Sequence, residues 1–332
     1  MSAQDERRVL RVRAGGLFIP SQIIVAYIDA YKDSFGVEPI CRVLKEHDYK
    51  IAPSTYYAFK LRPPSNRAIN DEILLDHIKR VYEENYSCYG VRKVWYSLLD
   101  DVEVLFKPGR DQVARLMRRA GLRGIRRLKR IITTVSDPAA AKSEDLVRRE
   151  WDQGAPNRVW VADFTEVRSR EGVVYVAFVQ DAGTRNILGF NVRTSRPAEL
   201  VETALEQAVN ARARVHGRQW LANGNLICHS DQGSQFTSIS YGRKLREYRI
   251  RGSMGAVGTS ADNALMESTI GLYKTELTNR RSWRSRQEIE TATAAWVTWF
   301  NQKRLHSELG YKSPARFEKE YYQNQALLRQ AV

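Results

Sequence analysis

The chain has 332 residues, of which 43% are hydrophobic and 10% aromatic, enough for at least one large core and two or three domains. Its formal net charge of +15 favours a polyanionic partner, because Lys and Arg release counterions when they bind nucleic-acid phosphates. Three scattered cysteines, no export signal and no apolar run long enough to cross a bilayer exclude a disulfide-rich or membrane-spanning protein, so we expect a cytoplasmic, nucleoid-associated one.

Residues 1–62 have the pattern of a small helical domain. Apolar residues recur at helical spacing in IIVAYIDAY and PICRVLKEH, and Pro53 and Ser54 begin a third helix in PSTYYAFK. Short helices with tight connections are typical of a helix-turn-helix, but many small helical domains have no role in DNA binding. The pattern leaves both interpretations open.

A second helical domain is expected at 66–135, after the Pro-Pro-Ser linker at 63–65. The segments YGVRKVWYSLLDD and GRDQVARLMRRAGLRGI predict paired helices, and the second places Val113, Leu116 and Met117 on one face. We expect that face to be buried and the remaining surface of the helix to be rich in arginine.

Positive charge is concentrated in this second domain. Between Lys107 and Arg130 there are ten basic residues and a single acidic residue, Asp111. Solvated helix surfaces normally mix both signs, so this excess indicates contact with DNA phosphates. The residues expected to make that contact are Arg115, Arg118, Arg119, Arg126, Arg127, Lys129 and Arg130.

After a linker at 136–154, the sequence becomes rich in strand-forming residues. RVWVADFTEV, GVVYVAFVQDA and NILGFNVRTS predict three consecutive strands of an antiparallel meander. The helical pattern PAELVETALEQAVNARARV then alternates with a short strand in NLICHS, a further helix and a strand ending near Ser253, which favours parallel pairing. Two long helices, at 260–279 and 285–301, complete the predicted α/β domain at 155–325, whose sheet is mixed.

Three acidic residues in this domain are candidates for metal binding. Asp163 lies inside an apolar strand, where an unpaired carboxylate is costly unless the strand is at a solvated edge. Asp231 ends a strand, where α/β folds bind ligands, although a turn-capping aspartate would look the same. Glu267 shares one helix face with Asn263 and Lys274, as on any solvated helix. The three acids together, with 35 residues between Asp231 and Glu267, are more specific than any one alone.

The segments WVADFT, HSDQGSQFTS and SADNALMESTIGLYKTE resemble the three acidic motifs of bacterial insertion-sequence transposases with a retroviral-integrase-type core, and the separation of 35 matches that family's signature. The tail WVTWFNQKRLHSELGYKSPARFE is similar to the family's usual ending. The greatest similarity is to the second-frame protein of the insertion-sequence-three family, whose transposase is assembled from two overlapping reading frames. Gln232 and Phe236 depart from residues frequent in the family, and neither departure affects the acids.

This resemblance implies an RNase H-like integrase catalytic core with a mixed five-stranded sheet, preceded by small all-α domains. It implies a DDE transposase, a polynucleotidyl transferase that cleaves and joins strands at insertion-sequence ends in DNA integration and recombination. Two Mg²⁺ ions per active site, or Mn²⁺ in their place, would assist in-line displacement. The residues implied are the catalytic and metal-binding Asp163, Asp231 and Glu267, the phosphate-binding Lys274, and the supporting Asn263 and Ser230, which could equally be caps.

The expected partners are double-stranded DNA, both as element ends and as target, further copies of the chain bound to that DNA, and the first-frame protein of the element. A nuclease of the same fold is one alternative. A non-catalytic DNA-binding regulator or incomplete product of the same element is another, because we find no long heptad segment near the start of the chain. His229 and His306 lack the spacing of zinc ligands, and we expect His306 to contact the DNA backbone or to pack.

Overall fold

The computed structural model consists of two compact units, Met1–Glu72 and Ile73–Val332, which meet within helix α4. The expected linker at 136–154 lies outside the described residues, and the expected domain limits stay predictions. The residues that the structure describes are 12–13, 16–17, 19–47, 49, 51–126, 155–221, 224–231, 233–254 and 263–330.

The first unit is built on three short helices, as the apolar spacing predicted. Its core comes from one face of each helix and includes Ile28, Cys41 and Tyr56. The Tyr56 hydroxyl donates to Asp29 Oδ1 at 2.7 Å, which ties the third helix to the first. A role for this unit in DNA binding stays a prediction. Its elements are β1 (Val12–Arg13), β2 (Gly16–Leu17), α1 (Ser21–Phe35), α2 (Val37–Glu46) and α3 (Pro53–Leu61).

The second unit begins with a helical segment. Its elements are α4 (Asn66–Glu84), α5 (Val91–Asp100) and α6 (Arg110–Arg119). In α6 the predicted apolar face, Val113, Leu116 and Met117, is buried in a core shared with α4 and α5, which confirms the paired helices.

A mixed five-stranded sheet forms the centre of the second unit, as predicted. Its strand order is β5-β4-β3-β6-β7, in which β3, β4 and β5 form the antiparallel meander and β6 and β7 run parallel to β3. Two short strands therefore extend the meander along one edge. The bounds are β3 (Val159–Ser169), β4 (Gly172–Asp181), β5 (Ile187–Arg193), β6 (Ile227–Ser230) and β7 (Arg251–Met254).

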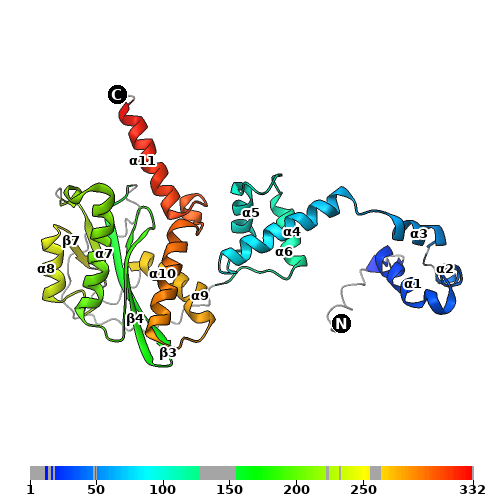
Figure 1. Ribbon diagram of the computed structural model, residues 1–332, viewed down its shortest axis with the longest axis horizontal. Helices are drawn as coiled ribbons and strands as arrows, with labels where there is room; N and C mark the ends of the chain where they lie inside the picture. The colour runs from blue at the N-terminus through cyan, green and yellow to red at the C-terminus, as the bar shows by residue number, and fades with distance from the viewer. Residues whose placement is uncertain are drawn as a thin grey trace. The chain divides into compact units, whose positions relative to one another are not determined.

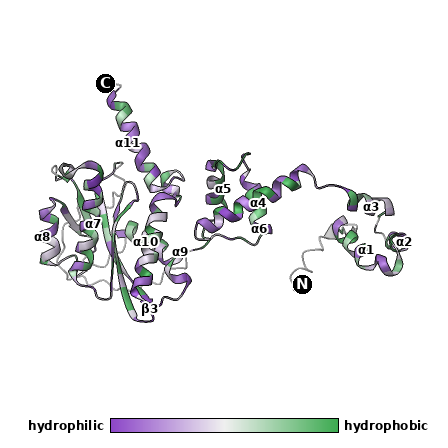
Figure 2. Ribbon diagram, viewed as in Figure 1, coloured by the Kyte–Doolittle hydropathy of each residue, from purple (hydrophilic) through white to green (hydrophobic). Residues whose placement is uncertain are grey.

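Helices cover both faces of the sheet, and Figure 1 shows α7 and α8 on one side and α9 and α10 on the other. Strand residues alternate between the two cores: Trp160 and Ala162 pack with α7, whereas Val161 packs with α9 and α10. Figure 2 shows the strands as largely apolar between helices of mixed polarity. The remaining elements are α7 (Ala198–His216), η2 (Arg218–Leu221), α8 (Ile239–Glu247), α9 (Ala264–Glu276), η4 (Thr278–Arg280), α10 (Arg286–Gln302), η5 (Ser307–Leu309) and α11 (Pro314–Gln330).

Helix α7 lies unusually close to the sheet at Gly189. A Cβ atom on this glycine would lie 2.0 Å from the carbonyl oxygen of Ala204, so only a residue without a side chain fits between strand and helix. None of the helices within the described residues combines the length and the apolar character needed to cross a bilayer.

Candidate active site

Strand pairing brings the two candidate aspartates together. Ala162 of β3 pairs with Ser230 of the parallel strand β6, so Asp163 is the next residue of β3 and Asp231 directly follows the end of β6. Neighbouring strands lie about 4.8 Å apart, and residues at equivalent positions point to the same face. Asp163 has the same parity as Val161, so both aspartates lie on the face of the sheet that α9 covers.

Helix α9 supplies the third acid. Met266, Ile270, Tyr273 and Leu277 are all buried, as the helical spacing predicted, and they fix the side of the helix that packs on the sheet. The ring of Tyr273 makes an edge contact with Phe178 of β4, with 5.1 Å between centroids. These contacts fix the orientation of α9, so the helix face next to the buried one, which bears Glu267, lies beside β3.

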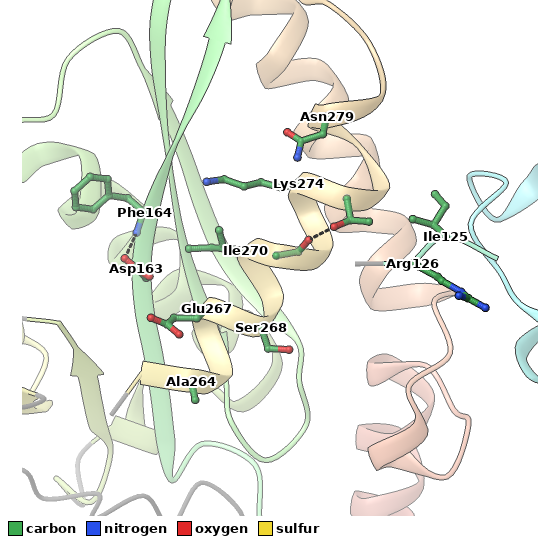
Figure 3. Close-up of a pocket in the computed structure, with 12 residues that line it drawn as sticks. Ile125, Arg126, Asp163, Phe164, Ala264, Glu267, Ser268, Ile270, Lys274 and Asn279 are labelled. Atoms are coloured by element: carbon green, nitrogen blue, oxygen red, sulfur yellow. Dashed lines mark hydrogen bonds between the residues drawn. The ribbon is translucent and has the colours of Figure 1, made fainter. Parts of the chain in front are cut away.

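An open pocket of about 630 Å³ separates α9 from β3. Figure 3 shows Asp163 and Glu267 facing each other across it, with Lys274 extending from α9 toward the strand. Asp231 does not line this pocket. Its charge nevertheless raises the pKa of Asp163, and the charge of Glu267 raises the pKa of Asp231. The structure therefore brings the three predicted acids into one electrostatically coupled group.

The carboxylates at this pocket, which we call the acid pocket, disfavour one another's charged forms. Burial, followed by the charge of Asp231, raises the pKa of Asp163 to about 8, and Lys274 offsets this only in part. The pKa of Asp231 is also raised, chiefly by desolvation of its carboxylate and then by Glu267. The amide of Gly233 donates to Asp231 Oδ1 at 3.0 Å and works in the opposite direction. A carboxyl group with a pKa of about 8 is mainly protonated at neutral pH, and a bound cation would take the place of that proton.

The oxygen atoms around this pocket suit a hard divalent cation. Asn263 donates through Nδ2 to the carbonyl of Ala162 at 3.2 Å, and its buried Oδ1 has no hydrogen-bond partner among the described residues. Ser230 is buried at the end of β6. Carboxylate and amide oxygens are the ligands that Mg²⁺ and Mn²⁺ prefer. In the described parts of the chain no three acidic, His or Cys side chains form a complete metal site.

The predicted DNA-binding residues lie in different places. Lys274 and Arg126 both line the acid pocket, Arg126 from the segment that follows α6. Arg118 and Arg119 are exposed on α6, and Arg115 is half-buried there. Arg127, Lys129 and Arg130 lie outside the described residues.

Neither of the two histidines considered for zinc lies in the acid pocket. His229 is buried in β6, where its Nδ1 lies 2.9 Å from Ser253 Oγ. The ring of His306 packs edge-on against Phe300, and burial followed by Arg304 lowers its pKa well below the usual range. The interpretation of His306 as a packing residue fits these contacts.

Sequence reasoning missed several residues that line the pocket. Ser268, Gly271, Thr275 and Asn279 lie along the accessible side of α9 and the turn after it. Gly271 follows Glu267 by four residues and Thr275 follows it by eight, so the helical period alone could have predicted that they share a helix face with Glu267. Phe164 also lines the pocket, and its amide donates to Asp163 Oδ1 at 2.8 Å.

Three protein-family models match parts of the chain. The family described as "Integrase core domain" matches residues 153–260, a second family of that description matches 248–314, and an "HTH-like domain" family matches 68–130. The HTLV-2 integrase catalytic core domain is 14% identical, with a TM-score of 0.33, over 49% of this chain and 97% of that structure.

Among curated relatives, a "Putative transposase for insertion sequence element IS986/IS6110" of Mycobacterium tuberculosis (strain CDC 1551 / Oshkosh) is 46% identical over 274 residues, which are 82% of this chain and 96% of the relative. A "Transposase for insertion sequence element IS629" of Shigella sonnei is 42% identical over 300 residues, 89% of this chain and 95% of the relative. With its integrase core and these relatives, the chain belongs to the DDE transposases of insertion sequences.

Proposed function

We propose that this protein is the DNA transposase of an insertion sequence, and that Asp163, Asp231 and Glu267 hold the divalent ions for cleavage and joining of DNA strands. The observation that carries the assignment is the convergence of these three carboxylates from two paired strands and one helix. Their mutual repulsion and desolvation favour bound cations.

Each acid has a role that follows from its position. Asp163 faces Glu267 across the pocket and its pKa responds to the charge of Asp231, so Asp163 would share bound ions with both other acids. Asp231 and Glu267 would each hold one of them. When bound, two Mg²⁺ or Mn²⁺ ions activate the attacking water or 3′-hydroxyl and stabilise the leaving oxygen of an in-line displacement.

Other residues of the pocket position the DNA. The ammonium group of Lys274 extends into the pocket beside the acids, where it can hold a phosphate next to the scissile bond. Arg126, which lines the pocket from the segment after α6, and Arg115, Arg118 and Arg119 on α6 would bind phosphates further along the duplex. We assign the same role to Arg127, Lys129 and Arg130.

The proposal also includes the more specific family, location and partners that the resemblance implies. We assign the protein to the insertion-sequence-three family as its second-frame product, acting in the bacterial cytoplasm on DNA. It would bind both element ends as a homo-oligomer and cooperate with the first-frame protein. A regulator that binds the ends without cleaving them is the second candidate, and the experiment below separates the two.

The proposal is tested with labelled duplexes that carry the element's own ends, incubated with Mg²⁺ or Mn²⁺ and either the parent protein or Asp231→Asn. We expect cleaved and joined products with the parent protein only, and equal or higher DNA affinity for the variant because one negative charge is removed. Equal cleavage by both proteins would refute the site. Tight binding without cleavage by the parent protein would favour the regulator.

A further inference from the structure

A second pocket, of about 460 Å³, lies where helix α5 meets the C-terminal tail of the core. Its charged lining consists of Arg92 and Lys93 from α5, Glu276 from the end of α9, and Arg304 from the tail segment KRLHSELGY. We call it the Lys93 pocket. The role proposed above for the acid pocket does not involve these residues.

The walls of the Lys93 pocket are fixed by contacts between residues distant in sequence. The Tyr89 hydroxyl accepts a hydrogen bond from the amide of Leu305 at 2.8 Å, and Trp299 Nε1 donates to Asn85 Oδ1 at 3.0 Å. The rings of Tyr96 and Tyr311 stack with 4.0 Å between centroids. These contacts join α5 and the turn before it to the tail, so the pocket is built into the packed core.

Arg304 and Glu276 form a hydrogen-bonded ion pair in the pocket. Arg304 donates through Nε and Nη2 to both carboxylate oxygens of Glu276, at 2.6 to 3.1 Å, and both side chains are almost fully buried. Because this pair is internally neutral, Glu276 has little remaining capacity to balance other cations.

Lys93 and Arg92 are the charges that remain. Lys93 Nζ lies 5.0 Å above the ring centre of Tyr89, and no residue in the described ranges gives it a hydrogen bond or an ion pair. Burial, followed by the neighbouring Arg304, lowers the pKa of Lys93 to about 8. Arg92 is exposed at the rim and also has no ion pair with a described residue. The pocket therefore has excess positive charge that fold stability does not require.

The Lys93 pocket is adjacent to the acid pocket. Ile125 and Thr275 line both, and Thr275 follows the phosphate-binding candidate Lys274 on α9. A strand that occupies the acid pocket would thus have its backbone phosphates within reach of the second pocket.

We propose that the Lys93 pocket binds a backbone phosphate of the DNA strand that enters the acid pocket, through Arg92 and Lys93 of α5. This proposal rests on the proposed function for its choice of DNA as the anion. Two adjacent cations in a partly desolvated pocket, with an Arg–Glu pair as its floor, suit a phosphate better than a neutral ligand.

The first test measures DNA affinity for Lys93→Gln, Lys93→Arg and the control Lys319→Gln, an exposed lysine on α11. All three are made in the Asp231→Asn background, with EDTA, so that binding is read without chemistry. We expect Lys93→Gln to weaken binding about 3- to 10-fold and to reduce the slope of log K against log salt by about 0.9. Lys93→Arg and Lys319→Gln should bind like their parent.

Thermal unfolding separates this role from a structural one. Removing a partly buried cation that lacks a counter-ion should leave the melting temperature of Lys93→Gln unchanged or raise it. A lower melting temperature together with weaker binding would overturn the proposal, as would an unchanged affinity and salt slope. If the parent protein never cleaves DNA but Lys93→Gln still weakens binding, the proposed function fails and the phosphate site stands.

A second measurement distinguishes DNA from a small anion. An acetylating reagent that attacks neutral amines is applied near pH 8, and modification of Lys93 is quantified by peptide mass spectrometry. We expect an end-bearing duplex to protect Lys93 and to leave Lys319 unprotected, and inorganic phosphate at the same phosphate concentration to protect Lys93 less. Protection by inorganic phosphate but not by the duplex would overturn the assignment to DNA.

Discussion

Helix α9 contributes to two clusters of charged residues that differ in how their charges are arranged. Glu276 and Arg304 form a closed pair with several hydrogen bonds. At the acid pocket the carboxylates of Asp163 and Glu267 act together with that of Asp231, and the ammonium group of Lys274 offsets part of their effect on Asp163. The first arrangement holds the tail against α9, whereas the second leaves charge for ions and DNA. The difference separates charges that maintain the fold from charges that serve a ligand.

The largest effect should come from the acid cluster formed by Asp163, Asp231 and Glu267. We expect Glu267→Gln to reduce strand cleavage at least about a thousandfold, because a metal-binding carboxylate is lost, while the free energy of unfolding is unchanged or higher. Cleavage rates are compared with those of Glu247→Gln, which changes an exposed glutamate on α8. Similar rates for the two variants would remove Glu267 from the active site.

The pair of Glu276 and Arg304 should respond in the opposite way, through a loss of folding stability. Glu276→Gln leaves the Arg304 charge buried without its counter-ion, so we expect a loss of about 3–5 kcal/mol in the free energy of unfolding. Urea denaturation measures this, with Glu308→Gln, an exposed change in the same tail, as the control. A loss below about 1 kcal/mol would mean that the pair does not hold the tail against α9.

A smaller effect is expected from the turn that holds Asp231. A Cβ atom on Gly233 would lie 3.0 Å from Asp231 Oδ1, so Gly233→Ala should displace that carboxylate by a few tenths of an ångström. Misplacement of a catalytic group on this scale lowers cleavage about 10- to 100-fold. The measurement is the cleavage rate at matched DNA occupancy. An unchanged rate would show that the turn tolerates a side chain without moving the acid.

The smallest effect concerns the arginines outside the acid cluster. We expect the combined change of Arg118, Arg119 and Arg126 to Gln to flatten the dependence of log K on log salt by about 2 to 3, since each phosphate contact contributes about 0.9. DNA binding titrations at several salt concentrations give the slope. If the slope stays the same, the duplex is bound elsewhere on the protein.

Much of the core could be predicted from the sequence because its signals are local. The alternation in WVADFTEV and the strand end at HSD predicted the two strands that precede or carry Asp163 and Asp231, which the structure pairs, and the buried stripe of α9 oriented Glu267. The grouping of the three acids also relied on resemblance to a family, because no local period shows that a helix packs beside a particular strand.

The Lys93 pocket could not be predicted, because long-range contacts create it. The hydrogen bond between Leu305 and Tyr89 joins residues 216 positions apart, and nothing in either segment alone indicates its partner. For the same reason Arg126, which lies within a basic run, could not be placed in the acid pocket from sequence. The tail motif is identified by its resemblance to a family, and the structure shows that it contacts α5.

The most direct test of the contrast between the clusters is the free energy of unfolding of the parent protein and Asp163→Asn at about pH 5 and about pH 9, with EDTA or with saturating Mg²⁺. The folded-state pKa of Asp163 is raised to about 8 from 3.8, so the folded protein binds more protons in this window and its stability falls as pH rises. We predict that the parent protein in EDTA loses stability toward pH 9, that Mg²⁺ restores it, and that Asp163→Asn shows neither effect. Equal pH dependence and equal stabilisation by Mg²⁺ in both proteins would contradict the account.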